Sequence, residues 1–226
     1  MSFYEDLKAA CPDEWASFVY HPFVQALGEG SLPRESFRHY LTQDYLFLKH
    51  FSRAYALAVF KSDTLEDMRQ AAATMNALLN EEMELHVGYC AQWGINQEAL
   101  EAEPEATANL AYTRFVIDQG LSGDLLDLLV ALTPCVLGYA EIGSRLFEEH
   151  IADLENNPYR PWVETYSGSD YQQVAGNSYG RLERIALARL GEDYRSSGRW
   201  QQLCKTFATA TRLEAGFWEM GLTRSR

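Results

Sequence analysis

Along most of the chain, apolar residues recur at intervals of three and four, while stretches that alternate between apolar and polar residues are short and rare. This spacing places side chains on one face of an α-helix, because a helix turns once every 3.6 residues. The chain is therefore expected to be all-α. The pattern predicts about seven long helices in one bundle, which forms a single domain over residues 1–226.

Prolines, glycines and capping residues predict where these helices begin and end. Pro12 and Pro22 should interrupt the first apolar stretch, because proline cannot continue a helix. The spacing of Ser169 and Gln172 predicts a capping box at a later helix start. The expected elements are a first stretch over 3–27, helices over about 33–61, 64–93, 105–119 and 124–155, a short aromatic segment at 159–166, and helices from 169 and over 196–220.

Three of the apolar stripes carry a chemically active side chain where an apolar one is expected. Cys135 lies in the stripe of the 124–155 helix, with Tyr139 one turn later on the same face. Asp44 holds the equivalent position in the second helix, and Glu214 holds it in the last. All three side chains are expected to point inward. A thiol, two acids and nearby phenols are what nucleophilic attack with proton transfer requires.

Each of these residues also has an ordinary structural interpretation. A free cysteine is often an inert core residue. Asp44 could be held by buried tyrosines or by Arg53, and Glu214 by a neighbouring helix, since a buried carboxylate needs partners. Pro134 is expected to kink the helix beside Cys135 and to open space at the thiol. The catalytic interpretation therefore rests on the three residues together.

Composition narrows the classes of partner. The net charge is −13 without a lysine or arginine cluster, which argues against binding nucleic acid or an anionic membrane. No uninterrupted apolar run approaches the roughly 18 residues that span a bilayer, and the acidic start does not resemble a signal peptide. A cytoplasmic protein is expected. The four cysteines lack a paired spacing and should be free thiols.

A metal centre is not predicted. Di-iron centres in helical bundles commonly use Glu-x-x-His pairs, and the chain has none. Glu82 and His86 share a helix face at i and i+4, but the acidic run at 81–84 is expected to form an exposed or interface surface. Haem ligation by His21 or His86 has no specific support.

Several motifs together point to one family. They are His21-Pro22-Phe23, Gln43-Asp44-Tyr45, Pro134-Cys135, Tyr139-Ala140-Glu141-Ile142-Gly143, the segment 162–166, Leu213-Glu214 and Phe217-Trp218-Glu219-Met220. With these motifs the chain resembles, over essentially its whole length, the TenA-type thiaminase II family, also called aminopyrimidine aminohydrolases. The resemblance implies a haem-oxygenase-like multi-helix bundle, no cofactor, and a homotetramer.

The resemblance also implies roles for individual residues. Cys135 would be the nucleophile that adds to an aminopyrimidine ring, and Glu214 would be the proton donor. Asp44 would hydrogen-bond the ring nitrogens. Tyr139, Tyr166 and Tyr112 would bind substrate. Phe47 would offer a stacking face where relatives often have tyrosine.

The implied reaction is hydrolysis of 4-amino-5-aminomethyl-2-methylpyrimidine to the 5-hydroxymethyl compound in thiamin salvage, with weaker cleavage of thiamin. Two alternatives from other classes stay open at this point. One is a haem-oxygenase-like metal oxidase, and the other is a non-catalytic protein that binds a pyrimidine or thiamin.

Overall fold

In the computed structural model, which describes residues 2–226 apart from the side chains of Glu81 and Leu85, every regular element is a helix, so the all-α prediction is confirmed. The elements are α1 (Phe3–Ala9), α2 (Pro12–Val19), α3 (Pro22–Gly28), α4 (Arg34–Lys61), α5 (Leu65–Ala77), η1 (Leu78–Glu82), α6 (Met83–Gln92), α7 (Gln97–Ala102), α8 (Thr107–Ser122), α9 (Leu125–His150), η2 (Leu154–Asn156), α10 (Arg160–Ser167), α11 (Ser169–Leu190), η3 (Tyr194–Ser196) and α12 (Trp200–Thr223).

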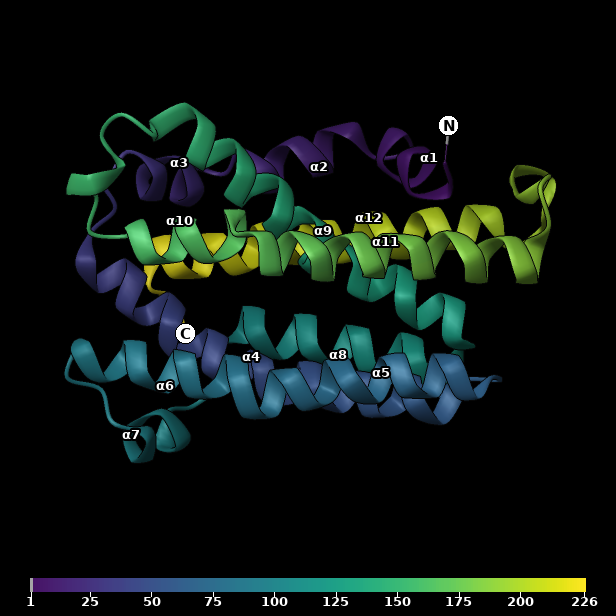
Figure 1. The fold of residues 1–226 in the computed structure, drawn as a ribbon, viewed down its shortest axis with the longest axis horizontal. Helices are drawn as coiled ribbons and strands as arrows, with labels where there is room; N and C mark the ends of the chain where they lie inside the picture. The colour runs from purple at the N-terminus through teal and green to yellow at the C-terminus, as the bar shows by residue number, and fades with distance from the viewer. Residues whose placement is uncertain (1) are drawn as a thin grey trace. The chain divides into compact units, whose positions relative to one another are not determined.

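The chain divides into two compact units. The first comprises Met1–Leu32 with Leu129–Trp218, and the second comprises Pro33–Leu128 with Glu219–Arg226. In the first unit, α11 packs against α1 and α10. In the second unit, α4 packs against α5, α6 and α8, and Figure 1 shows α5 and α8 running alongside it. The single domain over residues 1–226 stays a prediction.

Helix boundaries follow the proline signals and depart from the periodic pattern elsewhere. Pro12 and Pro22 each begin a helix, as expected, because a first-turn residue has no hydrogen-bond partner to lose. Residues 2–226 form twelve α-helices, of which seven have ten residues or more, in agreement with the expected number of long helices. The predicted 64–93 helix contains a π-helical turn at Leu78–Glu82, and the predicted 124–155 helix ends at His150.

α9 is long and apolar. Its length, and the mean hydropathy of 1.7 over an apolar window of 18 residues, would suit a membrane span, although charged and polar residues interrupt its apolar runs in the sequence. Within the structure, 83% of that apolar window is buried, as in the central helix of a folded core. Pro134 lies inside α9, directly before Cys135.

Candidate active site

In the first unit, a cluster of aromatic rings joins three helices around Tyr139. The Tyr139 ring on α9 lies 5.0 Å from the Tyr166 ring of α10 and 5.1 Å from the Trp218 ring of α12, measured between ring centroids. Trp162 of α10 lies 4.5 Å from Tyr166. Tyr139 is only 5% exposed. These contacts bring two of the predicted substrate-binding tyrosines together.

The predicted nucleophile and proton donor lie one helical turn before members of this cluster. Cys135 precedes Tyr139 by four residues on α9, and its thiol is half-buried. Glu214 precedes Trp218 by four residues on α12 and is 2% exposed, as predicted for an inward side chain. Residues at i and i+4 share a helix face. The thiol and the carboxyl are therefore on the helix faces that carry the Tyr139 and Trp218 rings.

Tyr166 is fixed in place by two neighbours. Gly143 of α9 faces its backbone so closely that an added Cβ would lie 2.5 Å from the Tyr166 carbonyl carbon. Gln172 of α11 donates hydrogen bonds to the carbonyl oxygens of Tyr166 and Ala140, at 2.8 and 3.0 Å. The predicted capping box is therefore wrong: Gly168 is the N-cap, and the Gln172 amide is used by the tertiary structure.

In the second unit, Asp44 of α4 is 6% exposed, as predicted. The Tyr40 hydroxyl donates to its Oδ2 at 3.4 Å. Nδ1 of His86, on α6, lies 3.7 Å from the same oxygen. Arg53 lies within 3.0 Å of the His50 ring. Of the sequence alternatives for Asp44, the structure thus supports a buried tyrosine.

Burial makes the surroundings of Asp44 unusual for an acid. It raises the pKa of Asp44 to about 7, against the opposing hydrogen bond from Tyr40. Glu82 ends the π-helical turn, and burial together with the charge of Asp44 raises its pKa to about 7. Burial lowers the pKa of His86, while the Leu41 carbonyl opposes this. Two carboxyls therefore titrate close to neutral pH.

Residues 81–84 were expected to form an exposed or interface surface. Glu84 is exposed and Glu82 is half-buried, although its carboxyl lies deep enough for burial to raise its pKa. The π-helical turn at Leu78–Glu82 changes which side chains share a face, and such turns are frequent at functional sites. The i, i+4 spacing of Glu82 and His86 was the sequence feature that could have indicated a site here. The acidic residues around Glu82 favoured a surface position instead.

Phe47 and Tyr112 lie together in the second unit. Phe47, one turn after Asp44 on α4, has its ring 5.2 Å from that of Tyr112 on α8, at an angle of 33°. Tyr112 has no exposed surface, and Phe47 is 5% exposed. The three predicted binding residues of α4 and α8, Asp44, Phe47 and Tyr112, therefore belong to one unit, and the rings of Phe47 and Tyr112 contact one another.

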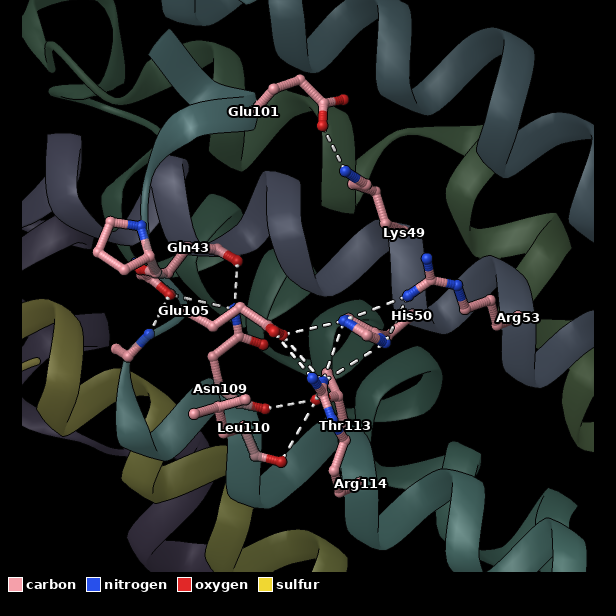
Figure 2. A network of polar contacts seen from close by, with 12 residues as sticks. Gln43, Lys49, His50, Arg53, Glu101, Glu105, Asn109, Leu110, Thr113 and Arg114 are labelled. Carbon is pink, nitrogen blue, oxygen red and sulfur yellow. Dashed lines mark hydrogen bonds and ion pairs between the residues drawn. The ribbon is translucent and has the colours of Figure 1, made fainter. Parts of the chain in front are cut away.

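Gln43, the neighbour of Asp44, holds the segment between α7 and α8 against α4 (Figure 2). Its amide donates to the Pro104 carbonyl at 3.0 Å, and its Oε1 accepts from the Ala106 amide at 2.9 Å. Asn109 donates to both the carbonyl oxygen and Oε1 of Gln43, at 2.9 and 3.1 Å. The motif Gln43-Asp44 thus combines a structural anchor with a candidate binding residue.

Farther along α4, His50 joins the same network in Figure 2. Its Nε2 lies 2.9 Å from Glu105, which also pairs with Arg114 at 2.8 Å. Burial lowers the pKa of His50, and the Arg114 charge adds to this. Among the residues whose side chains are described, His, Cys, Asp and Glu form no group of three suited to a metal ion, so no ligand set is assigned.

Comparisons with known proteins identify relatives of this chain. A relative from Halalkalibacterium halodurans, named aminopyrimidine aminohydrolase, is 35% identical over 221 residues, which cover 97% of this chain and 95% of the relative. A crystal structure of a TenA family transcription regulator from Silicibacter sp. TM1040 is 53% identical with a TM-score of 0.93, and the match covers 97% of this chain and 96% of that one.

The fold has a more distant counterpart. A Shewanella denitrificans domain with a heme oxygenase-like fold is 12% identical with a TM-score of 0.74, over 99% of this chain and 93% of that domain; this likeness concerns the fold alone. The predicted haem-oxygenase-like bundle is confirmed. Residues 9–224 match the model of the TENA/THI-4/PQQC family. The chain therefore belongs to the TENA/THI-4/PQQC family.

Proposed function

We propose that the protein is a hydrolase of thiamin metabolism that converts 4-amino-5-aminomethyl-2-methylpyrimidine and water into the 5-hydroxymethyl compound and ammonia. Its relative from H. halodurans, an aminopyrimidine aminohydrolase aligned over 97% of the chain, supports this activity. The structural observation that carries the proposal is the half-buried Cys135 thiol, one turn before a Tyr139 ring that contacts Tyr166 and Trp218. Thiamin, which carries the same pyrimidine, is proposed as a weaker substrate.

In the first half of the proposed reaction, the sulfur of Cys135 forms a bond to a carbon of the pyrimidine ring. The ring must accept an electron pair, so Glu214 delivers a proton to a ring nitrogen as the adduct forms. The bond between the exocyclic methylene and its amino group then breaks. The amino group leaves with the bonding electrons and a proton, as ammonia.

In the second half, water adds at the methylene carbon. Its oxygen forms the new C–O bond, and one of its protons returns to the carboxylate of Glu214. The bond between sulfur and the ring carbon then breaks, and the ring nitrogen releases to solvent the proton that it received, which offsets the proton that left with ammonia and restores the aromatic ring and the thiolate. The protein returns to its starting state, and each step uses only residues of this chain and water.

Binding is assigned to the remaining predicted residues. Asp44 hydrogen-bonds the nitrogen-bearing edge of the ring, and its near-neutral pKa of about 7 suits an exchange of protons with a weakly basic heterocycle. Phe47 and Tyr112 offer stacking faces. Phe47 lacks the hydroxyl that relatives often have at this position, so stacking is its proposed role.

The direct test is ammonia release from 4-amino-5-aminomethyl-2-methylpyrimidine by the purified protein. Replacement Cys135→Ala should lower the rate by about 1,000-fold or more, because the covalent route is lost. Cys204→Ala is the matched control, since Cys204 is the other half-buried free thiol, and its activity should be unchanged. Full activity of Cys135→Ala would overturn the mechanism. Binding of the pyrimidine without any turnover would replace the enzyme with a binding protein.

A cytoplasmic homotetramer is proposed as the working form. Large apolar side chains are exposed near the ends of three helices of the second unit: Phe60 is 80% exposed, Leu65 60% and Leu121 64%. Exposed apolar groups of this size favour association. The free cysteines suit a reducing compartment. Light scattering should give four times the chain mass, and a monomer at all concentrations would exclude the tetramer.

A further inference from the structure

The orientation of the His86 ring is set by a backbone oxygen. Its Nε2 lies 2.6 Å from the carbonyl oxygen of Leu41, which can only accept a hydrogen bond, so Nε2 carries the hydrogen. Burial lowers the pKa of His86, which keeps the ring neutral at pH 7. In the neutral ring with a hydrogen on Nε2, Nδ1 is an unprotonated acceptor.

That acceptor faces a second one. Nδ1 of His86 lies 3.7 Å from Oδ2 of Asp44, and both side chains are about nine-tenths buried. Two lone pairs at this separation repel one another unless a hydrogen donor lies against them. Burial raises the pKa of the Asp44 carboxyl to about 7, which favours a proton on the carboxyl and so relieves this repulsion. An N–H group of a ligand would replace this proton.

The other groups around Asp44 do not supply a cation between Asp44 and His86. Tyr40, on the same helix, donates to Oδ2 from 3.4 Å, and the thiol of Cys90 on α6 has its pKa raised by burial and by the charge of Asp44. Glu82 contributes a second acid. None of these is a cation.

The charged groups of α7 and α8 act on other parts of α4. Glu101 of α7 pairs with Lys49 and accepts from the Tyr45 hydroxyl. Arg114 of α8 pairs with Glu105. Among the described side chains, these cations therefore pair with other acids and do not contact Asp44 or His86. A ligand group that meets the Asp44–His86 pair is thus expected to be a hydrogen-bond donor.

We propose that Oδ2 of Asp44 and Nδ1 of His86 form a paired acceptor for the exocyclic amino group of the pyrimidine, which makes His86 a residue that determines specificity for an amino over an oxo substituent. This inference rests on the proposed function. A 4-oxo pyrimidine would place a third acceptor against the pair. Buried acceptors left without a donor typically lower affinity by about 100-fold or more.

Two variants of His86 distinguish the acceptor function of Nδ1 from the hydrogen bond that Nε2 donates to Leu41. In His86→Asn, Oδ1 takes the position of Nδ1 and the acceptor is kept. In His86→Gln, Nε2 takes the position of the histidine Nε2, so the bond to Leu41 is kept and the acceptor is lost. Calorimetry would measure binding of 4-amino-5-hydroxymethyl-2-methylpyrimidine and of its 4-oxo counterpart to each variant.

The wild type and His86→Asn should prefer the amino compound, and His86→Gln should lose about 10-fold or more of that preference. Unchanged preference in His86→Gln would overturn the role of His86 and leave the proposed function standing. Absence of binding of either compound to the wild type would instead overturn the proposed function, and with it this inference.

A measurement on the wild type does not depend on the variants folding. Nitrogen NMR of histidine-labelled protein distinguishes protonated from unprotonated ring nitrogens. An unprotonated Nδ1 whose resonance shifts when the amino compound binds is expected for His86. A protonated Nδ1 in the ligand-free protein at pH 7 would contradict the paired acceptor.

Discussion

The side-chain amide of Gln172 donates a hydrogen bond of 2.8 Å to the carbonyl oxygen of Tyr166, on the preceding helix. The same amide nitrogen donates to the Ala140 carbonyl of α9 at 3.0 Å. One glutamine therefore ties the end of α10 to the helix that carries Cys135. Because Tyr166 contacts Tyr139, the position of both proposed substrate-binding rings depends on this link.

Replacement Gln172→Ala should weaken substrate binding more than it weakens the chemical step, because it frees Tyr166 without touching Cys135. We expect a several-fold higher KM, a smaller change in kcat, and a loss of about 1–2 kcal/mol in the free energy of unfolding. Kinetics and urea denaturation measure these effects. Gln173→Ala is the control, since Gln173 is exposed and its side-chain amide donates to Asn177 on the same helix. Equal effects of the two replacements would show that the link to Tyr166 is unimportant.

Gly143 is required by the close approach of Tyr166. An added Cβ would lie 2.5 Å from the Tyr166 carbonyl carbon and 2.6 Å from its Cβ, and backbone cannot yield as a flexible side chain does. Gly143→Ala should cost about 1–3 kcal/mol of stability and lower activity. At Gly180 of α11 an added Cβ meets no atom within 4 Å, so Gly180→Ala should stabilise the helix by about 0.5–1 kcal/mol. Thermal unfolding should show a lower stability for Gly143→Ala and a higher one for Gly180→Ala, and assays should show lower activity for Gly143→Ala. A stabilised Gly143→Ala would contradict the prediction.

Gln43 should be more important for stability than a typical glutamine of a helix. It is 1% exposed, and its removal leaves the Ala106 amide and one Asn109 contact without their acceptor. We expect Gln43→Ala to lower the free energy of unfolding by about 2–3 kcal/mol. Gln70→Ala, at an exposed position of α5 where the side-chain amide donates to Glu66, should change it by less than about 0.5 kcal/mol. Denaturant titrations of the two variants test the difference, which should be absent if the network in Figure 2 contributes nothing.

The contribution of Asp44 to stability should fall as the pH rises towards neutrality. The pKa of Asp44 is raised from its ordinary value of 3.8 to about 7, so between these values the folded state binds more protons than the unfolded state. Under that condition the free energy of unfolding decreases with increasing pH. Glu82, raised to about 7, acts in the same direction.

Asp44→Asn removes the cost of ionising a buried carboxyl, because an amide stays neutral at every pH. Relative to the wild type, the variant should gain stability progressively from about pH 4 to pH 7 and keep a constant advantage above that. Asp118→Asn, at an exposed position of α8, should show no such trend. Denaturation curves at pH 4, 6 and 8 are the measurement. A stability difference between wild type and Asp44→Asn that does not change with pH would disprove the raised pKa.

The sequence by itself determined the helical class and the inward direction of its unusual polar groups. Spacing by three and four places Asp44 and Glu214 on apolar faces, and the structure buries them to 6% and 2% exposure. Proline positions also gave the starts of α2 and α3, because proline acts through its own backbone. These are local properties, and they can be read from neighbours along the chain.

Only the tertiary structure decided what those groups meet. Glu82 ends a π-helical turn, and burial together with the charge of Asp44 raises the pKa of its carboxyl, which the acidic run around it does not indicate in the sequence. The anchor of His86 on Leu41 joins residues 45 positions apart, and the Gln172 amide serves α9 and α10 where a local capping box was expected. Burial and hydrogen-bond partners depend on which helices pack together, so the protonation of Asp44 and the tautomer of His86 are set by contacts that helical periodicity does not encode.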